Sequence, residues 1–227
     1  MASYIEFTFD HSNELVELLI EHIELVLQTL VFALPLGILL GVFIAYYQPA
    51  AVTVLWGAGV AMTIPSLALF GLLIPILGIG NPPVIVALVL YAQLPIIRNT
   101  YIGLTSVDQS IIEAGRGVGM TKWQRLYKLQ IPIALPVMIA GIRNAIVILI
   151  GVATVGAYVG AGGLGFYIFT GIYQANVEMV VVTTIVVSLL ALVFDYGFKS
   201  IEQILQLRNG EEIPLTWGAK LLTRALP

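Results

Sequence analysis

The sequence predicts an all-α integral membrane protein with about five transmembrane helices. Of its 227 residues, 59% are hydrophobic and only 10% are charged, whereas soluble domains carry about 25% charged residues. Its apolar segments reach the ~20 residues that a helix needs to cross ~30 Å of hydrocarbon. They lack the period-2 alternation of a transmembrane β-barrel, and a helix satisfies its own backbone hydrogen bonds in lipid. The sequence therefore excludes a soluble fold and favours helical spans.

The five predicted spans lie between residues 24 and 203, which form the predicted transmembrane domain. Three of the prolines inside these spans, Pro65, Pro95 and Pro136, remove helix hydrogen bonds and can bend the chain. Each is a candidate hinge, and a static kink is an equally good interpretation. The predicted spans cover residues 24–47, 52–77 (interrupted at Pro65), 84–104, 133–155 and 177–197.

Residues 1–23 form an acidic segment ahead of the first span, without the basic residues that open a signal peptide. Four acidic side chains recur here at spacings of three and four residues, and they are Glu14, Glu17, Glu21 and Glu24. This spacing puts them on one face of an amphipathic helix that enters the first span. The face is either a surface that meets a binding protein or attracts cations, or a solvated face at the membrane boundary.

The positions of Lys and Arg predict the orientation of the chain. No basic residue occurs before Arg98, and the connections at 78–83 and 156–176 contain none. The basic residues gather in the third connection and after the fifth span. We therefore expect the N-terminus and residues 1–23 outside the cell, and the C-terminal tail, residues 204–227, in the cytoplasm. The basic residues of the third connection are Arg116, Lys122, Arg125 and Lys128, and those after the fifth span are Lys199, Arg208, Lys220 and Arg224.

The third connection carries the most informative motif of the chain. A polar, basic stretch runs from Glu113 and Ala114 through Gly119 to a hydrophobic segment that ends at Leu135-Pro136. It resembles the "EAA" loop of binding-protein-dependent ABC importer permeases, in which Glu-Ala-Ala is followed by Gly and by a hydrophobic stretch ending in Leu-Pro. Gly115 replaces the second Ala of that pattern, which exchanges one small residue for another.

The resemblance implies a type I ABC importer permease with a cytoplasmic coupling loop at about 106–132, where an ATPase subunit docks. It further implies two short helices, at 113–117 and 122–129, that meet at Gly119. The expected coupling residues are Glu113, Ala114, Gly115, Arg116, Gly119, Lys122, Trp123 and Arg125.

Further strings narrow the resemblance to one branch of this family. They are Thr63-Ile-Pro-Ser-Leu-Ala-Leu-Phe70, Leu94-Pro-Ile-Ile-Arg-Asn-Thr-Tyr101 and Gly160-Ala-Gly-Gly-Leu-Gly165. In this order they resemble the permeases of osmoprotectant importers, which move glycine betaine, carnitine or choline. The alternatives are an ABC permease for another small solute, such as an amino acid, and a secondary transporter. The latter would show intramembrane acids near the midplane and inverted repeats, and the sequence shows neither clearly.

The resemblance also implies the partners of the chain. They are two cytoplasmic ATPases that hold ATP and Mg²⁺, a second permease subunit (identical or a sister chain), an external solute-binding protein and membrane lipid. The implied location is the inner membrane of a bacterial or archaeal cell. Nothing in the sequence suggests a nucleic-acid partner.

Catalytic and metal-binding motifs are missing from the sequence. It contains no Cys and no G-x-x-x-x-G-K-[ST] phosphate-binding loop, so any ATP must bind another polypeptide. His11 and His22 do not have metal-ligand spacing, and we predict both to be ordinary surface residues. The G-x-G-x-x-G string at 160–165 lacks the strand and helix of a dinucleotide site, so we expect a turn or a re-entrant segment there.

Two groups of residues in or near the spans are candidates for an ion pair and for a substrate path. Asp195, Arg143 and Arg98 lie at comparable depths near the cytoplasmic boundary. We expect Asp195 to pair with one or both arginines, unless each side chain reaches the interface separately. The aromatic rings of Phe70, Tyr91 and Tyr158 could attract a quaternary ammonium along a substrate path, or they could serve as packing residues.

Overall fold

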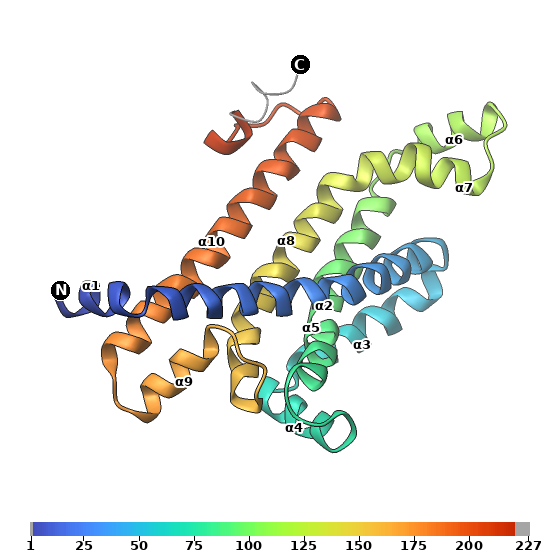
Figure 1. Ribbon diagram of the computed structural model, residues 1–227. Coiled ribbons are helices and arrows are strands. Elements are labelled where there is room, and N and C mark those ends of the chain that lie inside the picture. Colours follow the sequence, from blue (N-terminus) through green and yellow to red (C-terminus); the bar gives the residue numbers. More distant parts are fainter. Residues whose placement is uncertain (1, 221–227) are drawn as a thin grey trace.

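The computed structural model describes residues 2–220, and every regular element in that range is a helix. Four helices are long and apolar enough to cross a membrane: α2 (Ser12–Tyr46), α5 (Asn81–Thr105), α8 (Ile131–Gly156) and α10 (Val177–Arg208). Helix α2 lies across α5 and α8 in Figure 1, and a shared apolar core joins these three helices. This arrangement confirms the predicted all-α membrane fold.

The second predicted span is two helices, α3 (Ala51–Thr63) and α4 (Ser66–Leu77), with a bend of 96° between them. Pro65 causes the break, because a proline disfavours the helical conformation of the residue before it. Ile64 accordingly has the extended angles φ −71° and ψ 126°. The pair is either one broken span or a re-entrant loop. The described residues therefore contain four spans, or five if the bent pair counts as one.

Small residues allow α2 to approach α5 closely. A Cβ atom at Gly37 would lie 2.6 Å from Ile96 Cγ2, and one at Gly41 would lie 2.5 Å from Thr100 Cβ. The G-x-x-x-G spacing places both glycines on the same face of the helix. This face sets how deeply α2 sits on the core helices.

The N-terminal region differs from the prediction at two points. A short helix α1 (Ala2–Asp10) comes first, and α2 then runs without a break from Ser12 through the predicted boundary at residue 24. His22 is fully buried, contrary to the prediction of a surface histidine, and its Nε2 lies 3.1 Å from the Ile150 carbonyl oxygen. The amphipathic helix thus packs its apolar side, His22 included, against α8.

The glycine-rich string at 160–165 forms a tight loop between α8 and a short helix, α9 (Gly165–Tyr173). Gly160, Gly162 and Gly163 all have positive φ values, which side chains other than Gly rarely adopt. The carboxylate of Glu21 accepts a hydrogen bond of 2.9 Å from the Gly163 N–H. Helix α2, which carries the acidic side chains, is therefore hydrogen-bonded to this loop by residues 142 positions apart in sequence.

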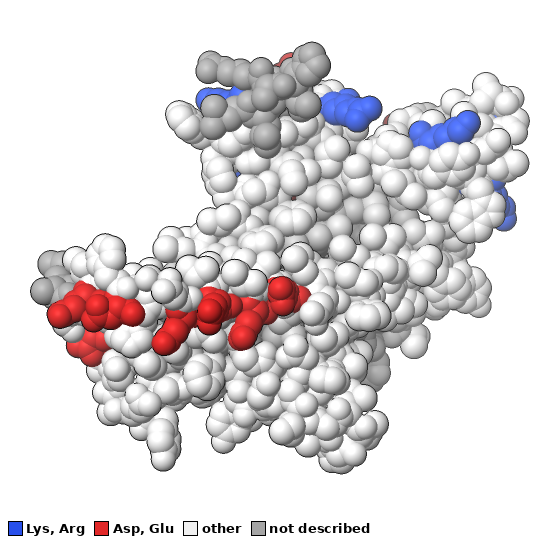
Figure 2. Space-filling model, viewed as in Figure 1, with Lys and Arg blue, Asp and Glu red and all other residues white. Residues whose placement is uncertain are grey.

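The other end of the molecule carries the basic residues. Figure 1 shows α6 (Gln109–Gly117) and α7 (Lys122–Arg125) at the end opposite α4 and α9, and α10 ends on the same upper side. Figure 2 shows Lys and Arg at this upper end and a row of acidic side chains along the N-terminal helices. The predicted separation of charge therefore exists in the fold.

The segment after α10 folds back onto that helix. Gln203 donates to the Pro214 carbonyl over 3.1 Å and accepts from the Thr216 backbone N–H over 2.9 Å. The Gly218 N–H donates to the Tyr196 hydroxyl over 2.7 Å. The predicted tail is thus attached to α10 as far as the structure describes it, and Arg224 lies outside the described residues.

Candidate coupling surface

The loop that carries the Glu-Ala motif begins with a well-capped helix. The Asp108 carboxylate accepts a hydrogen bond of 2.8 Å from the Ser110 N–H and caps α6. This bond lowers the pKa of Asp108, because it favours the charged carboxylate. At the other end, Gly119 has φ +80°, and the Met120 N–H bonds to the Gly115 carbonyl over 3.0 Å. This is a Schellman ending, whose left-handed residue is usually Gly.

Helix α7 begins two residues later with a capping box. The Gln124 N–H donates to the Thr121 hydroxyl over 3.2 Å, and the Thr121 N–H donates to the Gln124 side chain over 2.9 Å. The helix continues through a π turn at Leu126–Gln130 into α8. The π turn lies just before Pro132, which cannot donate to the carbonyl four residues earlier. The two helices predicted on either side of Gly119 are therefore present, but the second does not end at residue 129 and runs on into α8.

Most of the predicted coupling residues form an exposed surface. Trp123 is 72% exposed, and the other exposed members are Glu113, Ala114, Arg116, Gly119 and Lys122. Gly115 and Arg125 are buried instead. Arg125 donates to the Met120 carbonyl over 2.7 Å, and a Cβ at Gly115 would lie 2.8 Å from Leu129 Cδ1. These two residues hold the α6–α7 hairpin together rather than facing outward.

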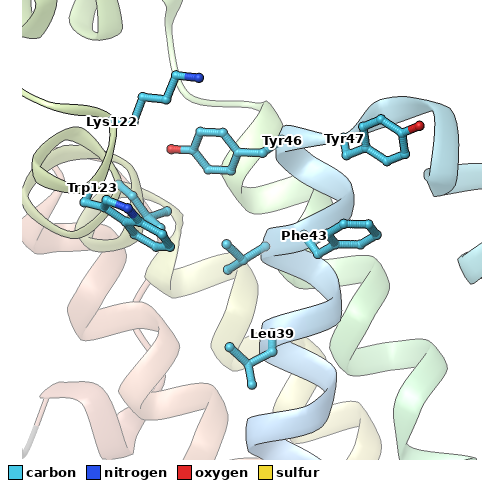
Figure 3. A pocket seen from close by; sticks show the side chains of 8 residues that line it. Leu39, Phe43, Tyr46, Tyr47, Lys122 and Trp123 are labelled. Carbon is cyan, nitrogen blue, oxygen red and sulfur yellow. The ribbon is translucent and has the colours of Figure 1, made fainter.

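An apolar groove of about 440 Å³ separates α7 from the end of α2. Figure 3 shows Tyr46 and Trp123 extending into it from opposite sides, with Leu39 and Phe43 along α2. The Tyr46 hydroxyl also donates to the side chain of Gln130 in the π turn. Sequence reasoning did not find this contact, because no local pattern links residues 46 and 130. It connects the hairpin directly to the first long helix.

The predicted ion pair is present between Asp195 and Arg143. Arg143 Nη1 lies 3.3 Å from Asp195 Oδ1, and Arg143 Nε lies 3.5 Å from Glu202 Oε2. Glu202 was not predicted, because it lies beyond the predicted end of the fifth span. Arg98 forms no ion pair with any described residue, so Arg143 is the one of the two predicted arginines that pairs with Asp195. It instead lines a groove that Asp195 also borders.

The three candidate path aromatics do not come together. Phe70 is fully buried in the core, and Tyr91 is 4% exposed, with its hydroxyl bonded to the Ile64 carbonyl. Tyr158 is exposed and contacts Phe169. The expectation that Phe70 and Tyr91 face a substrate path is therefore wrong for this structure. Phe70 and Tyr91 hold the α3–α4 break against α5.

The predicted hinge prolines occupy different settings. Pro65 lies at the break between α3 and α4, whereas Pro95 and Pro136 are buried inside the continuous helices α5 and α8. Asn99 donates to the Pro95 carbonyl over 2.8 Å. Pro65 therefore marks a sharp bend, and the hinge role of all three prolines stays a prediction.

Comparison with known proteins adds curated relatives that match most of the chain. The chain is 41% identical over 206 residues to the osmoprotectant import permease protein OsmW of Salmonella typhimurium, covering 88% of this chain and 96% of that one. It is 37% identical over 196 residues to the glycine betaine/carnitine/choline transport system permease protein OpuCB of Bacillus subtilis, covering 86% and 90%.

Solved structures share the fold at lower identity. An inward-facing form of the MetNI methionine ABC transporter gives a TM-score of 0.72 at 23% identity, covering 84% of this chain and 95% of that one. An amino acid ABC transporter gives 0.63 at 20% identity, covering 88% and 96%. The chain thus has the fold of a type I ABC importer permease.

A family match covers most of the chain and agrees with the fold. Residues 30–205 match the family described as binding-protein-dependent transport system inner membrane component. That range contains α5, α8 and the whole α6–α7 hairpin, together with the second half of α2 and most of α10. The chain is a multi-pass membrane transport subunit, and it belongs to the family of binding-protein-dependent transport system inner membrane components.

Proposed function

We propose that this protein is the permease subunit of an ATP-driven importer for compatible solutes such as glycine betaine, carnitine or choline. The observation that carries the solute class is the 36–41% identity to osmoprotectant, carnitine and choline permeases over 82% or more of the chain. The chain moves solute, and ATP with Mg²⁺ binds separate ATPase subunits. An amino acid is the second candidate solute, favoured only by the fold shared with amino acid transporters.

The exposed α6–α7 hairpin is the proposed docking surface for an ATPase. It projects from the rest of the protein (Figure 1), and the Asp108 cap, the Gly119 turn and the capping box at Thr121 make it stiff enough to act as a handle. Two ATPases would grip two such hairpins, one on each permease subunit. Their movement would pass through the π turn to α8, and through the Tyr46 contact to α2.

The proposed orientation places this basic end in the cytoplasm of a bacterial or archaeal cell. Lys and Arg favour the cytoplasmic side of the membrane, and they gather near α6, α7 and the end of α10 (Figure 2). The N-terminal helices, with their acidic side chains, then lie at the outer side. There they and the loop at 160–163 would meet a solute-binding protein.

Solute uptake by the reconstituted complex tests this function. Proteoliposomes would hold this permease, its ATPase and its partner subunits, with binding protein outside and ATP inside. We expect ATP-dependent uptake of at least one compatible solute from a panel of glycine betaine, carnitine and choline. Uptake of methionine or another amino acid alone would favour the second candidate, and uptake without ATP would contradict the proposal.

A further inference from the structure

A groove of about 440 Å³, lined by both polar and apolar side chains, lies where α3, α5, α8 and α10 meet. Its polar walls come from Arg98 and Asn99 on α5, Asn144 on α8 and Asp195 on α10. Met62, on α3, is one of its apolar residues. The groove brings together side chains from four helices that are up to 133 positions apart in sequence.

Arg98 is the unusual member of this group. Its side chain is exposed, and it forms no ion pair with a carboxylate within the described residues. It lies seven residues before the end of α5, which is roughly 10 Å along the helix axis. A guanidinium remains charged at any physiological pH, and a charge inside a span is costly unless it meets water, a partner or a ligand.

The groove is also lined by a side chain of the opposite charge. Asp195 lines it while one of its oxygens accepts from Arg143 over 3.3 Å. Asn144 is exposed, and its side chain makes no hydrogen bond with another described residue. No aromatic ring lines the groove, so a cation–π cage is not available there. A ligand would be recognised by its charges, above all by an anionic group that satisfies Arg98.

We infer that this groove is a transient binding site for the zwitterionic solute during its passage. The carboxylate of the solute binds Arg98, assisted by the Asn144 amide, and its quaternary ammonium lies toward Asp195. This inference rests on the proposed function and deepens it, because it selects carboxylate-bearing solutes such as glycine betaine and carnitine over choline, which has no carboxylate.

The test compares three solutes and three variants in proteoliposomes that hold the complete transporter. The variants are Arg98→Gln, Arg98→Lys and, as the matched control, Arg208→Gln at the exposed end of α10. Arg98→Gln should lower kcat/KM for glycine betaine and carnitine at least about tenfold, the value of a lost hydrogen bond to a charged group. Choline uptake should change less than about twofold. Arg98→Lys should be intermediate, and Arg208→Gln should match the wild type.

The ATPase activity stimulated by the binding protein separates binding from assembly. It should persist in Arg98→Gln. The inference would be overturned if Arg98→Gln lost that activity, lost uptake of all solutes equally, or kept its glycine betaine uptake unchanged. It would also be overturned if the wild type took up choline alone. If the wild type does not carry choline, retained ATPase activity with partial rescue by Lys supports it. Wild-type uptake of none of the three solutes would instead contradict the proposed function.

Discussion

The two ends of this protein acquire their structure in different ways. The α6–α7 hairpin is built from contacts close in sequence, namely the Asp108 cap, the Gly119 turn and the capping box at Thr121. The opposite end is built from distant contacts, such as Glu21 with the Gly163 N–H. The hairpin can therefore keep its shape while it moves. The opposite end is held in place by several helices at once.

The largest expected effect comes from crowding the end of the protein that carries the glycine-rich loop and α9. A Cβ at Gly165 would lie 1.9 Å from the Thr154 carbonyl oxygen, which belongs to the backbone of α8. Gly165→Ala should therefore lower the melting temperature of the purified complex by more than about 5 °C. Gly151→Ala is the matched control, because nothing lies within 4 Å of its Cβ position. Equal melting temperatures for the two variants would contradict this description.

The next effect concerns the hairpin and should appear in coupling rather than in folding. Gly119→Val puts a branched side chain at φ +80°, which costs about 1–3 kcal/mol locally. We expect the complex to assemble and to hydrolyse ATP while solute uptake falls strongly. Gly117→Ala is the control, since it has open space and lies in ordinary helix. Normal uptake by a stably assembled Gly119→Val complex would show that the hairpin geometry does not matter.

The smallest effect is a pH dependence at the start of the hairpin. The folded-state pKa of Asp108 is lowered, because its carboxylate accepts from the Ser110 N–H. The stabilisation is thus present above the ordinary carboxyl pKa and is lost as the pH falls through the folded value. Amide exchange at residues 110–112, corrected for its intrinsic pH dependence, should accelerate in acid. Asp108→Asn should remove that extra pH dependence, and identical profiles for the two proteins would contradict the assignment.

The sequence allowed the local features to be predicted and missed most of the distant ones. Hydrophobic length identified α5 and α10, and the Gly119 turn followed from the motif. The burial of His22 and the contact between Tyr46 and Gln130 depend on how separate helices pack. Periodicity along one helix carries no information about these contacts. The partner of Asp195 was predicted correctly because charges in a span have few alternatives.

The spans show the same limit. The break at Pro65 could be predicted from the sequence, but the angle of 96° between α3 and α4 could not. A proline restricts only the local backbone, and packing against the surrounding helices sets the direction of α4 relative to α3. Likewise, the predicted aromatic path failed because Phe70 and Tyr91 are core residues. An apolar span offers no pattern that separates a ring in the core from a ring in a path.

We expect the α6–α7 hairpin and the end of the protein that carries α9 to face opposite sides of the membrane. The chain has no native Cys, so single thiols can be placed at Val118, which is 75% exposed, and at Tyr173, which is 92% exposed. Intact cells would be treated with a membrane-impermeant thiol reagent. We expect Tyr173→Cys to react at once and Val118→Cys to react only after permeabilisation. The reverse pattern would place the hairpin outside the cell and contradict its role as the docking surface for an ATPase.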